Sequence, residues 1–312
     1  MVSNGRQYVC VIGAAAVDLS AVSFSKLVAT ESNPGKLHTS WGGVARNIAH
    51  NLARLDVDAK LLTILGDDAY SKRLRGHCEA EGIELIAEHT EEASMPAYLS
   101  VIEPQGEMSV AVSDMSLLET FDISMIKANA DTIRNAAICV IDTNLPSRLI
   151  DYLFEAFPDT DFCVDLVSIK KAGKVEKWLH RIAVIKPNRA EAAHLSAGEV
   201  DDHAPLDDIL AYYLRKGVGQ VFVSLGAEGL HFADKKTQGK LVAERTKLIN
   251  VTGAGDAMMA GIIYARLHGQ DLRKTAHIAM AAAQIAVQYN DAVNPAMSVA
   301  ALEKAMENIS DA

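Results

Sequence analysis

The amino-acid sequence predicts an α/β fold with a doubly wound, mostly parallel sheet flanked by helices and with a small β-rich lid. Short apolar runs, typical of parallel strands covered on both faces, alternate along the chain with helix-length amphipathic segments. Two stretches, at about residues 16–41 and 97–112, instead have the pattern of hairpins with no intervening helix. Because such hairpins do not fit a parallel sheet, we expect them to form one antiparallel lid inserted into a single domain that spans residues 1–312.

The predicted elements follow one another along the whole chain. The strands of the sheet are predicted at Tyr8–Ile12, Lys60–Leu65, Ala137–Ile141, Phe162–Val164, Ala183–Ile185 and Val221–Leu225. The helices are predicted at Val44–Leu55, Ala69–Glu81, Ser124–Asn135, Pro146–Ala156, Ala190–Leu195, Leu206–Lys216, Asp256–His268 and Leu272–Gln288. No Gly/Ser linker or internal repeat separates them, which favours one domain.

Composition excludes several classes of protein. The chain has 312 residues, of which 49% are hydrophobic and 22% charged, as in globular proteins. Its net charge of -10 argues against nucleic acid or an anionic membrane as a partner. There is no run of 18 apolar residues and no secretory-signal pattern, so a cytoplasmic protein is expected. The four cysteines form no CxxC pair and are expected to be buried thiols, and the ten histidines have no HxxxH or HxH spacing, so no transition-metal site is expected.

The segment Asn250–Asp256, with the sequence NVTGAGD, carries the strongest chemical signal. Gly253 and Gly255 allow a sharp turn that exposes backbone N–H groups, including that of Ala254, at the start of a helix, where the helix dipole favours an anion. Asp256 could accept a proton from a hydroxyl while these amides stabilise a phosphoryl group in transfer. Taken alone, the pattern also fits a plain glycine turn with Asp256 as a helix N-cap.

Further motifs occur in a fixed order, and together they resemble the ribokinase-like sugar kinases, the phosphofructokinase B family. The matching pieces are Gly13 with Asp18, Gly42–Ala49 (GGVARNIA), Lys186–Glu191 (KPNRAE), Ser224–Gly229 (SLGAEG) and Gly253–Asp256 (GAGD). The resemblance extends from about Val9 to Ala300. It implies a ribokinase-like fold and the ATP-dependent phosphorylation of a primary hydroxyl on a sugar or nucleoside, with Mg²⁺ as cofactor.

The resemblance also implies a role for the residues of each motif. Gly42, Gly43 and Asn47 would bind the acceptor, and Asp18 would accept hydrogen bonds from vicinal hydroxyls, although Asp18 alone could be a simple turn residue. The nucleotide would contact a set of small and polar residues: Asn188, Ser224, Gly226, Gly229 and Thr252.

Asn188 and Glu191 lie on one face of a helix start, where their oxygens would suit Mg²⁺ through water; alone, this pair fits a capping box. A K⁺ ion near Asn250, Thr252 and the loop Asp291–Asn294 is a further implication of the resemblance.

Some segments are similar, within the family, to the pseudouridine kinases. They are Ser32–Lys36, Tyr98–Ser100, Val164–Ser168 and Asn250–Thr252. The implied acceptor is the 5′-hydroxyl of pseudouridine, with Tyr98, Ser100 and Lys171 closing over or contacting the nucleoside. Tyr98 could instead pack inside the lid, and Lys171 could be solvated. Two departures from the family pattern, Ala16 in place of a polar residue and Leu166 in place of a proline, bear on the substrate more than on the chemistry.

Other functions remain open at this level. The same chemistry could act on ribose, fructose, 2-keto-3-deoxygluconate or a purine nucleoside. A ligand-sensing protein that keeps the fold would be expected to have lost the GAGD or NxxE residues, and both are intact. Apolar lid residues such as Val101, Val110 and Val112 would be a liability on a monomer, so a homodimer formed through the lid is expected.

Overall fold

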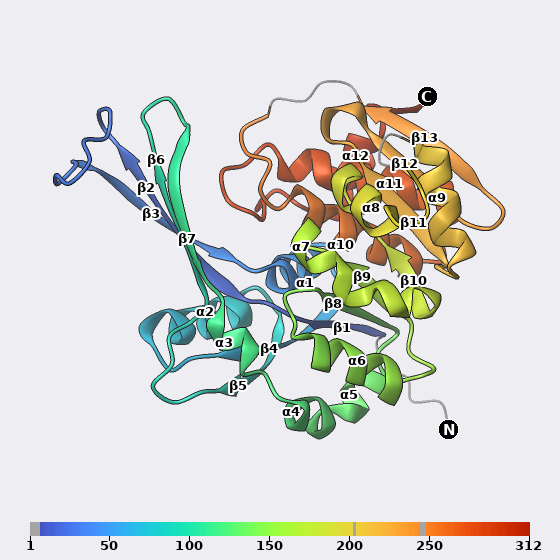
Figure 1. Ribbon diagram of the computed structural model, residues 1–312, viewed down its shortest axis with the longest axis horizontal. Coiled ribbons are helices and arrows are strands. Elements are labelled where there is room, and N and C mark those ends of the chain that lie inside the picture. The colour runs from blue at the N-terminus through green and yellow to red at the C-terminus, as the bar shows by residue number, and fades with distance from the viewer. Residues whose placement is uncertain (1–6, 202–203, 244–247) are drawn as a thin grey trace.

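The computed structural model describes residues 7–201, 204–243 and 248–312, which form two β-sheets (Figure 1). The large sheet has ten strands in the order β14-β13-β12-β11-β10-β9-β8-β1-β4-β5. Their bounds are β1 Tyr8–Ile12, β4 Asp58–Leu65, β5 Glu84–His89, β8 Ile138–Asp142, β9 Phe162–Asp165, β10 Ile182–Ile185, β11 Gln220–Ser224, β12 Leu230–Ala233, β13 Gln238–Ala243 and β14 Ile309–Asp311. The strands from β5 to β11 in this order are parallel and β12 to β14 are antiparallel, which confirms the predicted fold class.

Helices cover both faces of the large sheet. One face carries α1 (Val44–Arg54), α2 (Ala69–Ala80), α10 (Ala254–Leu267), α11 (Leu272–Ala286) and α12 (Val299–Met306). The other carries α3 (Ser116–Glu119), α4 (Ile123–Ala128), α5 (Ala130–Arg134), α6 (Ser147–Ala156), α7 (Ile169–Ala172), the 3-10 helix η1 (Gly173–Arg181), α8 (Arg189–Ser196) and α9 (Leu206–Arg215). Strand residues alternate between the two cores: Val9 and Val11 of β1 lie in the first, Cys10 and Ile12 in the second.

The helix predicted over Ser124–Asn135 is interrupted, so this prediction is wrong in one respect. α4 ends at Ala128 and α5 begins at Ala130, with Asn129 between them. The side-chain amide of Asn129 donates a hydrogen bond to the carbonyl of Met125 at 2.9 Å. Asparagine competes in this way for backbone partners, and the chain starts a new helix after it.

The small sheet projects from the large one on the left of Figure 1 and has the order β3-β2-β6-β7. Its strands are β2 (Ala16–Ser23), β3 (Gly35–Gly42), β6 (Ala97–Ile102) and β7 (Met108–Asp114), close to the two predicted hairpins. The expectation of an antiparallel sheet is wrong for the central pair, because β2 and β6 are parallel. The chain between the hairpins crosses the large sheet through β4 and β5 and returns in the original direction, as a parallel pair requires.

The two faces of the small sheet differ in chemistry. Asp18, Ser40 and Tyr98 are directly paired across β2, β3 and β6, so they share one face. The neighbouring residues along each strand point to the opposite face. That face carries exposed apolar side chains, namely Leu37 (79% exposed), Leu99 (41%), Val110 (52%) and Val112 (59%).

Two other expectations concern the body of the protein. All four cysteines are buried and form no disulfide, in agreement with the prediction of free thiols. Among the helices in the described ranges, none combines the length and the apolar character needed to cross a bilayer.

Candidate active site

A row of polar residues lies at the carboxyl ends of four adjacent parallel strands. Asp142 ends β8, Asp165 ends β9, Lys186 directly follows β10, and Ser224 ends β11. Although they are far apart in sequence, the strand order places them side by side. Open α/β sheets bind ligands at this edge, so the topology itself marks it as the site to examine.

A cavity of about 770 Å³ opens at this edge. Its volume lies within the range of small-molecule and cofactor sites. Its lining contains both charged and apolar side chains. The lining residues are Val44, Asp165, Val167, Lys186, Asn188, Glu191, Ser224, Gly226, Ala227, Gly229, Leu248, Val251, Ala254, Gly255, Asp256, Met258, Met280, Ala283, Gln284 and Val287.

Helix α10 begins at the cavity, with Gly253 as its N-cap residue. Gly253 has φ 80°, and a Cβ added to it would lie 2.0 Å from the carbonyl oxygen of Ala292. Only glycine fits here for both reasons. Because Gly253 has no side chain, it cannot cap the helix, and no side chain accepts a hydrogen bond from the first turn as a cap. The N–H of Ala254 donates to the carbonyl of Val251 at 3.3 Å, and a helix start without a side-chain cap is a position that favours an anion.

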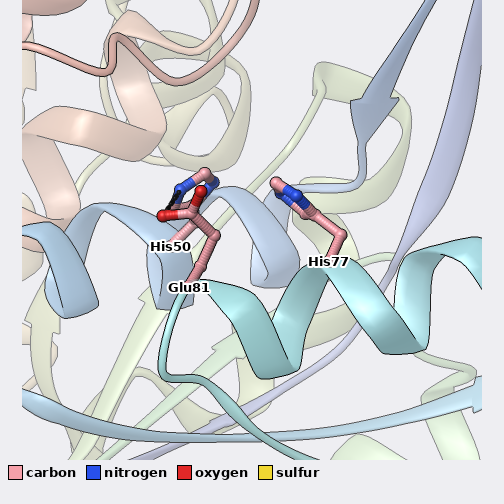
Figure 2. Close-up of side chains that lie close together, drawn as sticks. All are labelled: His50, His77 and Glu81. Carbon is pink, nitrogen blue, oxygen red and sulfur yellow. Dashed lines mark ion pairs between the residues drawn. The ribbon is translucent and has the colours of Figure 1, made fainter.

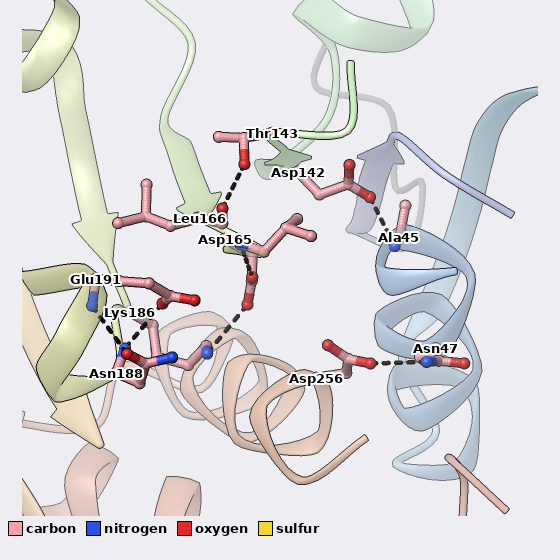
Figure 3. A network of polar contacts seen from close by, with 11 residues as sticks. Ala45, Asn47, Asp142, Thr143, Asp165, Leu166, Lys186, Asn188, Glu191 and Asp256 are labelled. Atoms are coloured by element: carbon pink, nitrogen blue, oxygen red, sulfur yellow. Dashed lines mark hydrogen bonds and ion pairs between the residues drawn. The ribbon is translucent and has the colours of Figure 1, made fainter. Parts of the chain in front are cut away.

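The carboxyl of Asp256, in the first turn of α10, has a strongly perturbed pKa. It is buried, and the side-chain amide of Asn47 donates a hydrogen bond to its Oδ2 at 2.7 Å (Figure 3). Burial, with the nearby negative charge of Asp165, raises the pKa of Asp256 to about 7, although Asn47, Lys186 and Arg46 act against the rise. A carboxyl with a pKa near neutrality is suited to proton transfer.

A buried ion pair lies next to Asp256. The Nζ of Lys186 is 3.1 Å from the Oδ2 of Asp165, and both side chains are 6% exposed. Burial alone would lower the pKa of Lys186, but the carboxylates of Asp165 and Asp256 outweigh it and raise that pKa. The other oxygen of Asp165 accepts the backbone N–H of Val167 at 2.9 Å, which fixes the loop after β9. Lys186 therefore presents a permanent positive charge to the cavity.

Asn188 and Glu191 form a complete capping box at the start of α8. The Oδ1 of Asn188 accepts the N–H of Glu191 and the Oε2 of Glu191 accepts the N–H of Asn188, both at 2.9 Å. The capping box that the sequence pattern of this pair suggests is thus present in the fold. Burial raises the pKa of Glu191.

The same edge of the cavity offers oxygen ligands, the kind that Mg²⁺ prefers. Asp165, Glu191 and Asp256 all line it, although the Oδ2 of Asp165 is already in the ion pair with Lys186. This set of donors fits Mg²⁺.

Four of the residues expected to bind the acceptor lie on β2, at the end of β3 and at the start of α1. The carboxylate of Asp18 packs against Gly42, where an added Cβ would lie 2.4 Å from both of its oxygens. Gly43 has φ 89°, and a Cβ there would lie 2.4 Å from the carbonyl oxygen of Ala14. Asn47, one turn into α1, reaches Asp256. Burial raises the pKa of Asp18.

All seven residues expected to bind the acceptor lie outside the lining of the cavity, including Tyr98, Ser100 and Lys171. Tyr98 and Ser100 belong to β6 of the small sheet, and Lys171 belongs to α7. The Nζ of Lys171 donates to the side-chain oxygen of Asn144 at 2.5 Å, so it is anchored rather than free in solvent. The structure brings neither β6 nor Lys171 against Asp256.

Only some of the residues expected at the nucleotide and K⁺ sites line the cavity. Ser224, Gly226 and Gly229 line the cavity, whereas Thr252 does not. The side chain of Asn250 donates to the carbonyl of Asn290 at 2.5 Å and accepts the N–H of Thr252 at 2.9 Å. Asn250 is therefore adjacent to the predicted loop, but its oxygen already has a partner.

The sequence did not single out Asp142, Asp165 or Arg46 as site residues. Arg46 is fully buried and donates through Nε to the carbonyl of Gly42 at 3.2 Å, so it holds the glycine loop from within. For Asp142 and Asp165 a signal existed, because each is a carboxylate at the carboxyl end of an apolar strand. For Arg46 none existed, since an arginine within a helix is usually exposed.

His50, His77 and Glu81 approach one another between α1 and α2, although their spacing gave no sign of a metal site (Figure 2). The Nε2 of His50 lies 3.1 Å from Glu81, and Arg54 forms an ion pair with the same carboxylate at 2.7 Å. Arg46 approaches the Nδ1 of His50 at 3.3 Å, and burial lowers the pKa of His50 to about 3. With one guanidinium paired to the carboxylate and a second beside the neutral imidazole, this cluster disfavours a cation and is best described as a bridge between the two helices.

Comparison with known proteins agrees with the geometry. The chain is 31% identical over 307 residues to the pseudouridine kinase of Escherichia coli K12, covering 97% of each chain. It is also 31% identical over 297 residues to the uncharacterized sugar kinase YeiI of the same organism, covering 94% of this chain and 82% of that one. The structure of Arabidopsis thaliana ribokinase complexed with ribose and ATP superposes with a TM-score of 0.80 at 19% identity, covering 97% of this chain and 99% of that chain.

The model of the pfkB family of carbohydrate kinases matches residues 6–298, nearly the whole chain. Taken with the site at the carboxyl edge of the sheet, this match shows that the chain belongs to the pfkB family of carbohydrate kinases.

Proposed function

We propose that this kinase transfers the γ-phosphoryl group of ATP to the 5′-hydroxyl of pseudouridine, giving pseudouridine 5′-phosphate and ADP. The observation that carries the phosphotransfer is the buried carboxyl of Asp256, with a pKa of about 7, at the uncapped start of α10. The choice of acceptor is supported by the 31% identity to a pseudouridine kinase over 97% of both chains. Because the chain is also 31% identical to an uncharacterized sugar kinase, an experiment must decide which acceptor is phosphorylated.

In the proposed reaction, Asp256 accepts the proton of the attacking hydroxyl. The hydroxyl oxygen forms a bond to the γ-phosphorus as the bond between that phosphorus and the β-phosphate oxygen breaks, and ADP leaves. The N–H groups of Gly253, Ala254 and Gly255 stabilise the charge on the phosphoryl oxygens. Asn47 holds the carboxyl of Asp256 in the orientation required, at 2.7 Å.

The remaining residues of the site hold the two substrates. Asp18, Gly42 and Gly43 bind the ribosyl hydroxyls, while the nucleotide occupies the cavity beside Ser224, Gly226 and Gly229. Asn188 and Glu191 would hold Mg²⁺, which would supply charge neutralisation on the phosphates. Thr252 and Asn250 would border the K⁺ site.

The small sheet would act as the lid over the acceptor. Its polar face, with Asp18, Tyr98 and Ser100, points to the acceptor side, and lid closure excludes water from the reaction. A contact between the sheet and the body already exists, because the Nε2 of His38 on β3 lies 2.8 Å from Asp291. The opposite, apolar face of the sheet favours a homodimer formed through it.

The deciding experiment is an assay of ADP release with Mg-ATP in potassium buffer. The acceptors are pseudouridine, uridine, ribose, fructose and adenosine. Turnover on pseudouridine with little on uridine is the expected result, since it requires recognition of the C-linked base. A preference for a free sugar or a purine nucleoside would overturn the acceptor and leave Asp256 as the base. Equal rates in potassium and tetramethylammonium would overturn the K⁺ site.

A further inference from the structure

Helix α1 begins beside the acceptor site without a capping side chain of its own. Its N-cap residue is Gly43, which has none to offer. A carboxylate from a distant strand takes that place: the Oδ2 of Asp142, at the end of β8, accepts the backbone N–H of Ala45 at 3.0 Å (Figure 3). The first turn of the helix that carries Asn47 is therefore capped by a residue 97 positions away in sequence.

The same carboxylate holds a second loop of the site. Its Oδ2 also accepts the N–H of Ala14, in the turn between β1 and β2, at 2.9 Å. β2 begins two residues later and carries Asp18. The Oδ1 accepts the N–H of Asn144 at 2.8 Å, which fixes the orientation of the carboxylate. One side chain thus joins the strand of Asp18 to the helix of Asn47.

The environment of Asp142 is that of a structural anion rather than a proton donor. The residue is 1% exposed, and within the described ranges no basic side chain lies at ion-pair distance from it. Burial raises its pKa, while the three backbone N–H groups lower it. A Cβ added to Gly13 would lie 2.3 Å from its Oδ2, so the carboxylate is tightly enclosed. An ionised group this deeply buried depends on its N–H donors for stability.

We propose that Asp142 is a positioning residue of the acceptor site, whose carboxylate sets the distance between Asp18 on β2 and the Gly43–Asn47 start of α1. The proposal rests on the proposed phosphotransfer function and adds to it a residue that touches no reacting atom. The nucleotide side of the cavity receives no hydrogen bond from this carboxylate. Loss of its charge would therefore weaken acceptor binding and leave nucleotide binding unchanged.

The test compares Asp142→Asn with a matched control, Asp271→Asn. Asp271 is likewise a helix N-cap, accepting the N–H of Lys274 at 2.8 Å, but it lies at the start of α11 and accepts no hydrogen bond from Ala14 or Ala45. In D142N the amide NH₂ must face at least one backbone N–H, because one carbonyl oxygen cannot replace both carboxylate oxygens. We expect the KM for the acceptor to rise at least tenfold in D142N with the KM for ATP within twofold, and neither to change in D271N. An unchanged acceptor KM in D142N, or an equal rise in both KM values, would overturn the proposal.

A second measurement does not depend on the identity of the acceptor. Hydrogen–deuterium exchange of peptides covering residues 13–18 and 42–48 should be faster in D142N than in wild type, and unchanged there in D271N. Unaltered exchange in both peptides would overturn the positioning role even if no acceptor were found. If wild type phosphorylates none of the acceptors while exchange changes as expected, the proposed function fails and the positioning role stands.

If D142N does not fold, Asp142→Ser takes its place, since a hydroxyl can accept an N–H without adding the fixed donors of an amide. Failure of both variants to fold would show that Asp142 acts on the whole fold rather than on the acceptor site, and would overturn the proposal.

Discussion

Replacing Asp256 by Asn is expected to abolish most of the activity while stabilising the folded protein. Asn has nearly the same shape, and its oxygen can still accept the hydrogen bond that Asn47 makes at 2.7 Å. It cannot take a proton from the acceptor hydroxyl. Positioned general bases contribute about 10²–10⁴-fold to a rate, so kcat should fall by at least two orders of magnitude, with ATP binding retained.

The gain in stability follows from the pKa of Asp256. Burial raises it from the ordinary value of 3.8 to about 7. Because the folded state binds the proton more tightly than the unfolded chain, the ionised carboxyl destabilises the fold as the pH rises from about 4 to 7. The shift corresponds to at most about 4 kcal/mol above pH 7, and to nothing below pH 4. D256N should therefore exceed wild type in free energy of unfolding by more at pH 8 than at pH 5.

Two assays test this reasoning together. Urea unfolding at pH 5 and pH 8 gives the difference in free energy of unfolding, and ADP release gives kcat across the same range. In wild type, kcat/KM should increase with pH through about 7, as expected for a base that must be ionised. Near-wild-type turnover in D256N would refute Asp256 as the base. A difference in unfolding free energy that does not depend on pH would refute the perturbed pKa.

Three further predictions concern other parts of the site. Gly253→Ala places a Cβ 2.0 Å from the carbonyl oxygen of Ala292 at a residue with φ 80°. We expect the free energy of unfolding, measured in urea, to fall by about 1–3 kcal/mol and the turnover to fall at least a hundredfold. Wild-type values for both quantities would refute this prediction. Lys186→Met leaves the Asp165 carboxylate buried without its partner and should cost about 3–5 kcal/mol of stability, a loss that the double variant with Asp165→Asn should partly restore. Val110→Glu puts a charge on the apolar face of the small sheet and should convert a dimer into a monomer in sedimentation, whereas a wild type that sediments as a monomer at micromolar concentration would refute the dimer.

Much of the fold could be predicted from the sequence because its signals are local. The strand Tyr8–Ile12 is a continuous apolar run that follows a polar segment and ends at Gly13, and its observed bounds equal the predicted ones. The turn at Gly253 was recognisable from glycine spacing alone, since the backbone geometry it requires excludes other residues. β5, at Glu84–His89, was missed because its polar residues weaken the apolar pattern that marked the other strands.

The parts that could not be predicted depend on contacts between distant residues. The parallel pairing of β2 with β6 is decided by the path of the chain through the large sheet, which no local pattern encodes. Likewise, Asn188 and Glu191 taken alone fit a capping box, and their role as metal ligands was implied only by the family resemblance. The capping box in the structure needs no ligand. Whether Asn188 and Glu191 also hold a metal ion depends on the ligand that binds in the cavity.

The perturbed carboxyl of Asp256 illustrates why a sequence motif alone cannot establish a base. In GAGD the aspartate could be a helix N-cap with an ordinary pKa, and only burial beside Asp165 changes this. If Lys186 were paired with Asp256, its charge would keep the Asp256 carboxyl ionised. Instead, the Nζ of Lys186 is paired with Asp165 at 3.1 Å, so its positive charge acts on both carboxylates. The Asp165–Lys186 pair therefore leaves Asp256 able to exchange a proton near neutral pH, while keeping a positive charge in the cavity that faces the phosphates. Residues outside the recognisable motif thus decide whether the motif can act.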